Sequence, residues 1–309
     1  MGRFLLSRVV TALGSMLGVA CLVFLLIHLV PGDPVDVMLG ESARPADRQA
    51  LRTSLGLDQP IDEQLVNYFS GLAHFDLGHS LHSKRPVSEL LAERIPATLE
   101  LAIAALFVAV VIAVPLGILA AVERGKSWDW GAMGFSMLGV SIPNFWLGPM
   151  LILCFSLWLG LTPVSGRGGL SNLILPAVTL GTGFAAILAR MVRSSLLEVL
   201  GEDFVRTARA KGVSELQVIW RHAMRNAWLP VVTLLGLQLG ALLGGAVVTE
   251  VVFDWPGIGS LMIESIQKRD YPVVQGCVLF ISLMYVLVNT LTDLLYGLID
   301  PRIRLDNAK

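Results

Sequence analysis

The chain has 309 residues and a net charge of −1; 54% of the residues are hydrophobic and only 15% are charged. A soluble domain carries about 25% charged residues, so the composition excludes an ordinary soluble protein, and the balanced charge argues against nucleic acid as a partner. The three cysteines, Cys21, Cys154 and Cys277, all lie in apolar runs, which excludes a disulfide framework and offers no metal-ligand spacing.

Six apolar stretches are long enough to cross a membrane, since a helix of about 20 residues spans the hydrocarbon core. The third contains Pro143 and Pro149, so we expect a kink or break near Pro143. The first is longer than the core of a signal peptide, about 7–15 residues, so we expect an uncleaved span. The sequence predicts an all-α polytopic membrane protein with six transmembrane helices at residues 9–30, 97–121, 131–160, 176–193, 229–252 and 273–298.

The distribution of lysine and arginine predicts the orientation of these spans. With the N-terminus in the cytoplasm, the inner segments hold 14 of these residues and the two short outer loops hold 3. Short cytoplasmic segments carry the excess of positive charge. We therefore expect both termini in the cytoplasm.

The predicted spans divide the chain into three parts. Residues 1–30 are the N-terminal tail and first span, 31–96 an extracytoplasmic loop, and 97–309 a five-span core with a cytoplasmic loop at 194–228. The outer loop opens with a turn at 31–34. Its apolar residues recur at helical spacing between positions 61 and 72, which predicts a partly helical cap. We predict no metal site; a metal on His74, His79 and His82 of this loop is the open alternative.

The cytoplasmic loop carries the most informative pattern. Acidic residues at 202 and 203 favour a helix start, and Gly212 favours a left-handed helix end. Ser214 and Gln217 have the spacing of a capping box, which predicts a second helix. A helix–glycine–helix unit follows. These local features alone fit a partner-docking element and an amphipathic hairpin on the membrane surface about equally well.

Residues 206–212, Arg-Thr-Ala-Arg-Ala-Lys-Gly, resemble the cytoplasmic loop of permeases in bacterial ABC importers, in the version of the peptide subgroup. Arg206-Thr207-Ala208 stands where the general family has Glu-Ala-Ala, and the Leu229-Pro230 step comes later than in the general pattern; both departures fit that subgroup. The resemblance covers almost the whole chain, through the segments 31–34, 55–60, 76–78, 96–100, 141–146, 174–176, 255–259, 269–272 and 300–302.

The resemblance implies a type I ABC importer permease of the dipeptide, oligopeptide, nickel and glutathione group, in the inner membrane of a bacterial cell. It implies that this chain forms half of a translocation pathway for di- or oligopeptides, with nickel or another chelated metal, or glutathione, as alternative cargo. The implied partners are a second related permease, two cytoplasmic ATPase subunits, an extracytoplasmic substrate-binding protein and membrane lipid. It also implies a set of ATPase-coupling residues: Arg206, Thr207, Ala208, Ala210, Lys211 and Gly212.

The chain contains no Gly-x-x-x-x-Gly-Lys-Ser/Thr phosphate cradle. We therefore expect that it is not an enzyme and carries no cofactor, and that ATP and magnesium belong to a partner ATPase.

Uncharged polar residues lie in the middle of the spans, whereas the charged Glu100, Arg190, Glu250 and Asp293 lie near their ends. Such polar groups either line a wet translocation path or bond between packed helices. The path candidates are Ser141, Asn144, Thr179, Thr182, Gln238 and Asn289.

Glycines every four residues in the fifth span predict close helix packing, with a pairing surface for a second permease as the alternative. These are Gly236, Gly240 and Gly244. The segment 255–259 after this span predicts a turn and a surface helix that seals the outer mouth.

Three other classes of membrane protein compete with this interpretation. An intramembrane serine protease needs a general base near its serine, and no histidine lies in the middle of another span. A secondary transporter needs coupling-ion ligands near the midplane and an internal repeat, and neither is visible. A channel or passive scaffold is excluded only by the resemblance.

Overall fold

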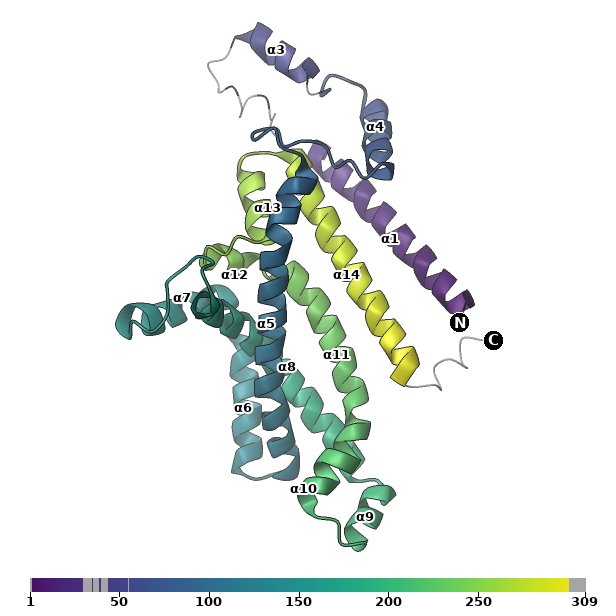
Figure 1. The fold of residues 1–309 in the computed structure, drawn as a ribbon, viewed down its shortest axis with the longest axis vertical. Coiled ribbons are helices and arrows are strands. Elements are labelled where there is room, and N and C mark those ends of the chain that lie inside the picture. Colours follow the sequence, from purple (N-terminus) through teal and green to yellow (C-terminus); the bar gives the residue numbers. More distant parts are fainter. Residues whose placement is uncertain (1, 30–34, 36–38, 40–43, 55, 300–309) are drawn as a thin grey trace.

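The computed structural model describes residues 2–29, 35, 39, 44–54 and 56–299 (Figure 1). Within them no strand occurs apart from one isolated bridge between His79 and Pro86, so the all-α prediction is confirmed. The elements in chain order are α1 (Gly2–Leu29), α3 (Pro45–Ser54), α4 (Ile61–Ala73), α5 (Val87–Val122), α6 (Ser127–Ser141), α7 (Asn144–Leu151), the π-helical η1 (Ile152–Trp158), α8 (Leu170–Leu200), α9 (Asp203–Ala210), α10 (Glu215–Gln217), the π-helical η2 (Val218–Ala223), α11 (Met224–Gly245), α12 (Val247–Val252), α13 (Ile258–Gln267) and α14 (Tyr271–Ile299).

Apolar helices occupy all six predicted stretches, although their lengths differ from the prediction. The pair Ser127–Ser141 and Asn144–Trp158 can count as one bent span, and Val10–Leu25 within α1 is a shorter apolar helix. The multi-span architecture is therefore confirmed, whereas the number of six crossings stays a prediction. Among the described residues, four helices are by themselves long and apolar enough to cross a membrane: Val87–Val122, Leu170–Leu200, Glu215–Gly244 and Tyr271–Thr292.

The third stretch breaks near Pro143, as predicted. α6 ends at Ser141, the backbone of Ile142 and Pro143 is extended, and α7 begins at Asn144. Proline pushes the preceding residue out of the helical region and has no N–H to continue the helix. The two halves consequently meet at a bend of 103°, so that α7 and η1 turn away from the direction of α6 (Figure 1).

The second span begins earlier than its apolar run predicts. α5 starts at Val87, and both Pro96 and Pro115 lie inside it. Proline inside a helix costs about 3 kcal/mol or more, so other contacts must support the first turns of α5. Val87 and Leu91 are buried there and pack with Ile258 of α13 in one apolar cluster. This tertiary support is not visible in the local sequence.

The centre of the molecule is a close packing of α5, α6 and α8, and α8 exceeds its predicted stretch at both ends (Figure 1). Small residues bring these helices together. A Cβ atom added at Gly117 of α5 would lie 2.6 Å from the Cβ of Val192, and one at Gly139 of α6 would lie 2.8 Å from the Cβ of Ala186. Membrane helices associate through such close contact because lipid removes the hydrophobic drive between them.

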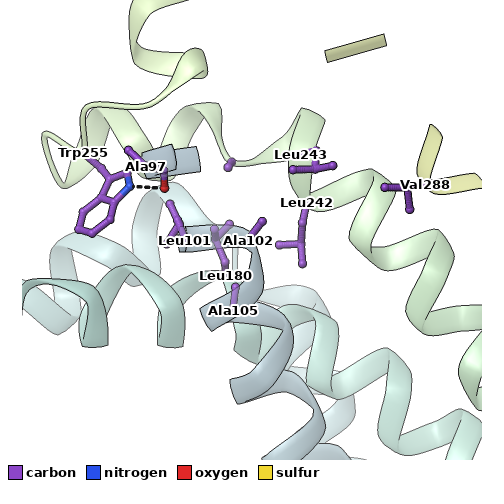
Figure 2. Close-up of a cluster of buried hydrophobic side chains, with 10 residues drawn as sticks. Ala97, Leu101, Ala102, Ala105, Leu180, Leu242, Leu243, Trp255 and Val288 are labelled. Carbon is purple, nitrogen blue, oxygen red and sulfur yellow. Dashed lines mark hydrogen bonds between the residues drawn. The ribbon is translucent and has the colours of Figure 1, made fainter. Parts of the chain in front are cut away.

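The turn after α12 lies in the core, so the prediction of a surface segment at the outer mouth is wrong for this turn. Trp255 is completely buried, and its Nε1–H donates to the carbonyl oxygen of Ala97 at 2.8 Å (Figure 2). Thr98 Oγ1 donates to buried Glu250 at 2.7 Å and accepts from the backbone N–H of Ile258 at 2.8 Å. Because these buried polar groups are paired, the turn can hold α12 and α13 against the start of α5.

The long outer segment contains α3 and α4, at the end of the molecule away from α9 and α10 (Figure 1). α4 is the amphipathic helix that the apolar spacing predicts. Its Tyr68 packs on Phe24 of α1 with ring centroids 5.6 Å apart, and burial raises the pKa of Tyr68 to about 12, so the phenol stays neutral at ordinary pH. The turn expected at residues 31–34 lies outside the described residues.

A buried aspartate ties the end of this outer segment to the core. Asp270 precedes α14 and accepts hydrogen bonds from Ser80 Oγ at 2.5 Å and from the backbone N–H of Leu81 at 3.0 Å. Bonds to a carboxylate are stronger than bonds between neutral groups. The stretch before α5 is thereby fixed at the turn between α13 and α14.

The three regularly spaced glycines of α11 face α14. A Cβ atom at Gly236 would lie 2.1 Å from Oγ1 of Thr292, one at Gly240 would lie 3.1 Å from the ring of Tyr285, and one at Gly244 would lie 3.6 Å from Ile281. The contact therefore tightens from Gly244 toward Gly236. α14 of the same chain covers Gly240, whereas Gly244 is exposed, so close packing is seen toward Gly236 and the alternative of a pairing surface at Gly244 stays a prediction.

Replacing Gly236 with alanine is expected to destabilise the protein, because the new methyl group must push α14 away. Overpacking of this kind costs about 1–3 kcal/mol. The measurement is the midpoint of thermal unfolding of the detergent-purified protein. Gly244→Ala, where the added Cβ meets only ordinary contacts, is the matched control and should melt close to the wild type. Equal midpoints for all three proteins would contradict the packing.

Candidate functional site

α9 and α10 form a helical pair that projects beyond α8 and α11 at one end of the molecule (Figure 1). α9 begins with Asp203 in its first turn, and the chain reverses at Gly212, whose φ of +77° lies in the left-handed region. Such a conformation is strained for residues with a Cβ atom. The predicted helix–glycine–helix unit is thus present in the structure, at the junction between α8 and α11.

The turn of this pair is closed by an ion pair instead of the predicted capping box. Ser214 precedes α10 but makes no side-chain capping hydrogen bond. Arg209 of α9 reaches across the turn, where its Nε and Nη2 donate to the two carboxylate oxygens of Glu215 at 2.8 and 3.2 Å. The fork-shaped guanidinium fits a carboxylate with two parallel bonds. The predicted capping box is therefore wrong in its side-chain contact, although the helix does start after Ser214.

An apolar cluster fixes the pair to the end of α8. Ala208, which sequence reasoning grouped with the ATPase-coupling residues, belongs to this cluster and is buried. Its side chain therefore holds the two helices together and is not available to a partner. The cluster has three buried members, Val205, Ala208 and Val218, packed with Val199, Leu200 and Val213.

The solvent-exposed surface of the pair combines positive charge with apolar side chains. The other five predicted coupling residues, Arg206, Thr207, Ala210, Lys211 and Gly212, are all exposed. Between and beside them lie three large apolar residues that sequence reasoning did not select. Phe204 is 41% exposed, Leu216 69% and Trp220 52%. The spacing of four between Leu216 and Trp220, which places two apolar residues on one helical face, is a signal that could have found them.

A second ion pair joins the C-terminal part of α8 to α6. Arg193 donates from Nε to Asp129 Oδ1 at 2.6 Å and from Nη2 to Asp129 Oδ2 at 2.8 Å. Asp129 also accepts from the backbone N–H of Gly125 at 2.9 Å, in the turn between α5 and α6. The Asp129 side chain is 9% exposed and that of Arg193 26%, so the carboxylate is the better shielded of the two partners. The helical pair and the central helices are consequently connected through α8.

Three of the six polar path candidates are satisfied within their own helices. Ser141, Thr179 and Thr182 donate their hydroxyls to the carbonyl oxygen four residues earlier, at 2.7, 2.8 and 2.7 Å. Ser141 is exposed and Thr179 is buried. A hydroxyl that bonds back to its own helix needs no neighbouring helix to satisfy it.

The amide side chains among the candidates lie in separate helix contacts. Gln238 of α11 donates Nε2 to the carbonyl oxygen of Phe184 in α8 at 3.1 Å. Its Oε1, and Oδ1 of Asn289 in α14, are buried without a hydrogen-bond partner in the described part of the chain. Asn144 starts α7 and lies beside Gly183 of α8. A buried acceptor without a hydrogen-bond donor is costly. Among the described residues, Gln238 and Asn289 are the path candidates with such an acceptor.

Two of the three histidines in the segment before α5 bond to the backbone through their side chains. His74 Nδ1 lies 2.8 Å from the carbonyl oxygen of Ser70, and His82 Nε2 lies 2.7 Å from that of Lys268. Among the described residues, no group of three histidine, cysteine, aspartate or glutamate side chains is placed to hold a metal ion.

Comparison with known proteins places this geometry in a family. Residues 113–305 match the family described as binding-protein-dependent transport system inner membrane component, and residues 1–102 match the N-terminal part described for such membrane components. The chain is 45% identical over 334 aligned residues to the dipeptide transport system permease protein DppB of Escherichia coli (strain K12), covering 98% of each chain. It is also 45% identical over 302 residues to the glutathione transport system permease protein GsiC of Salmonella choleraesuis (strain SC-B67), covering 98% of this chain and 99% of that one.

Solved structures share the fold. The MetNI methionine ABC transporter, in an inward-facing conformation, matches with a TM-score of 0.57 and 23% identity, over 68% of this chain and 96% of that chain. The resemblance seen in the sequence motifs is thereby confirmed. The chain belongs to the family of inner membrane components of binding-protein-dependent transport systems: it is a multi-pass permease subunit, and ATP hydrolysis in such a system lies in a separate subunit.

Proposed function

We propose that this permease forms half of the pathway through which an ATP-driven importer takes up di- and oligopeptides. The relatives support the cargo class, because they are described as permeases for dipeptides, for di- and tripeptides and for glutathione, at 45% identity in each case. Glutathione is itself a tripeptide, so a short peptide is the chemistry that these cargoes share. Glutathione is the second candidate, favoured by its equal identity.

The observation that carries the proposal is the exposed face of α9 and α10. Large apolar side chains there lie beyond the ends of α8 and α11, next to Arg206 and Lys211. An apolar patch with a basic rim fits a protein partner, and the proposed partner is an ATPase subunit. In the complete importer, two such subunits carry ATP and magnesium, a second related permease completes the pathway, and a binding protein delivers cargo from outside.

The proposed orientation places α9 and α10 in the cytoplasm and α3 and α4 outside. The two pairs lie at opposite ends of the molecule, and α1 begins, and α14 ends, away from α3 and α4 (Figure 1). This arrangement agrees with the excess of lysine and arginine in the inner segments, and it leaves both termini in the cytoplasm.

In the proposed cycle, ATP binding draws the two ATPase subunits together and moves the attached helical pairs. The motion enters the membrane through α8, which Arg193 joins to α6 and which packs closely on α5 at Gly117. The pathway then opens outward and accepts the peptide from the binding protein.

Uptake by the complete complex in proteoliposomes tests the cargo. With the native binding protein outside and ATP inside, a labelled dipeptide should accumulate, and excess unlabelled di- and tripeptides should compete for uptake. Competition by glutathione alone would favour the second candidate. Accumulation of nickel without competition by any peptide would contradict the peptide proposal.

Replacing Gly212 with valine is expected to reduce uptake per ATP hydrolysed, because valine cannot adopt the left-handed turn without strain. Strain of about 1–3 kcal/mol at this position would reshape the pair between its two helices. The measurement is the ratio of peptide uptake to ATP hydrolysis. Gly212→Asn is the matched control, because asparagine tolerates a positive φ, and it should keep most of the coupling. Normal coupling in Gly212→Val would contradict this role.

Removing the exposed apolar side chains should weaken ATPase binding. Leu216→Ala and Trp220→Ala are each expected to lower the affinity by about 1–2 kcal/mol or more, the loss typical of a central interface residue. Reversing the charges of Arg206 and Lys211 should weaken recovery of the complex further. Affinity is measured by titrating the purified ATPase onto the permease in nanodiscs. Trp128→Ala, at a similarly exposed residue of α6, is the control; an equal loss there would argue against a specific surface.

A further inference from the structure

A glycine-rich segment, residues 159–169, connects η1 to α8 and is here called the outer strap. It lies beside α7 and α12, at one side of the molecule and away from α9 and α10 (Figure 1). Three of its glycines have positive φ: Gly160 at +62°, Gly166 at +85° and Gly169 at +154°. Glycine adopts these conformations at no steric cost. The strap therefore begins and ends at residues about which the backbone can turn.

Several contacts hold the strap. Asn172 Nδ2 donates to the carbonyl oxygen of Ser165 at 3.1 Å, and Ser156 Oγ donates to that of Pro163 at 3.2 Å. The backbone N–H of Gly166 donates to the carbonyl oxygen of Phe253 at 2.9 Å. Arg167 reaches Glu100 on α5, where its Nε lies 2.8 Å and its Nη2 2.6 Å from the same carboxylate oxygen, Oε2. The guanidinium also lies 5.9 Å from the ring centroid of Trp255, at cation–π distance. The strap is thus tied to α5 and to the turn after α12.

Both charged partners stand alone in long apolar stretches. Arg167 is the only charged residue between Asp129 and Arg190, and Glu100 is the only one between Arg94 and Glu123. Glu100 lies near the end of a predicted span, where a charge is costly and usually serves function, whereas Arg167 lies in the loop between two spans. Two isolated charges, 67 positions apart in the chain, meet here across the strap.

The surface beneath the strap is buried, whereas the ion pair that holds the strap is partly exposed to water. Trp255 is fully buried, and its indole N–H bonds to Ala97 (Figure 2). By contrast, the side chains of Arg167 and Glu100 are 37% and 36% exposed. Ion pairs in contact with water contribute little to stability. This pair can open and close without unfolding the buried turn below it.

The strap is also continuous with the bent third segment. Chain that leaves η1 enters the strap directly, and α7 touches the turn after α12, since a Cβ atom at Gly148 would lie 3.1 Å from Val252 and from the ring of Phe253. Lifting the strap would therefore pull on α7 and η1, which turn away from α6 at the 103° bend.

From this geometry we propose that Arg167 and Glu100 form a latch that holds the outer strap closed over Trp255 and opens when the importer turns outward. The inference rests on the proposed function, since it assigns the latch to the outer gate of an importer. Arg167 and Glu100 act as positioning residues: they set the balance between closed and open outer states.

The test uses the complete complex in proteoliposomes, with Arg167→Gln and Glu100→Gln. Without the latch, the outward state becomes easier to reach. ATP hydrolysis in the absence of binding protein should then rise about two- to fivefold, the factor that one exposed ion pair can supply, and uptake per ATP should fall. Arg167→Lys keeps the charge next to Glu100 and Trp255 and should retain near wild-type behaviour.

A matched control is available in the stretch just before α5. Arg85 also pairs with glutamates, Glu89 and Glu93, but both lie on α5, a few residues further along the chain. Arg85→Gln should leave hydrolysis without binding protein unchanged. The latch is overturned if Arg167→Gln only lowers the thermal midpoint while hydrolysis per assembled complex stays at the wild-type value, or if Arg167→Lys behaves like Arg167→Gln. Hydrolysis is measured without cargo, so a wrong cargo assignment would abolish peptide uptake by the wild type and leave this readout intact.

Discussion

The close contact between α5 and α8 is the interaction on which the membrane part of this protein depends. Burying leucines between membrane helices gains no hydrophobic free energy, because lipid tails are equally apolar. Membrane helices are therefore held by close van der Waals contact. Gly117 and Gly181 provide it, since a Cβ atom at Gly181 would lie 2.7 Å from the carbonyl oxygen of Ala105. The parts assigned a role in transport attach to these two helices. α9 and α10 continue from α8, and the buried turn at Trp255 rests on the start of α5.

Two ion pairs between distant parts of the chain differ in how exposed their side chains are to water. Asp129 and Arg193, near the helical pair, form a shielded two-bond contact that connects α6 and α8. Glu100 and Arg167, away from that pair, are more open to water. Water weakens an ion pair, because it competes for both charges. In the proposed cycle, the less exposed pair lies toward the end that would contact the ATPase, and the more exposed pair lies toward the side that would receive cargo.

Exposed apolar side chains have different meanings in different parts of the molecule. Those on α5 and α6, such as Phe107 and Met137, lie along apolar helices, where lipid surrounds them. Phe204 and Leu216 lie on the projecting pair, and Trp220 lies in the adjoining η2. Exposure of such side chains to water is unfavourable, which is why we propose that a protein partner covers these three residues. The same physics explains why Ala208 is buried: it closes the small core that keeps the pair in shape.

Local chemistry was enough to predict the all-α fold, the break at Pro143, the amphipathic helix α4 and the reversal at Gly212, because proline geometry, helical spacing and positive φ act within a few residues. Motifs spread along the chain were enough to identify the family. Only the tertiary structure decided that α5 begins at Val87 in spite of Pro96, that Trp255 is buried and that Arg209 closes the turn through Glu215. Only the tertiary structure brings Glu100 and Arg167 together. Contacts between distant residues depend on how the helices pack, and no local sequence pattern specifies that packing.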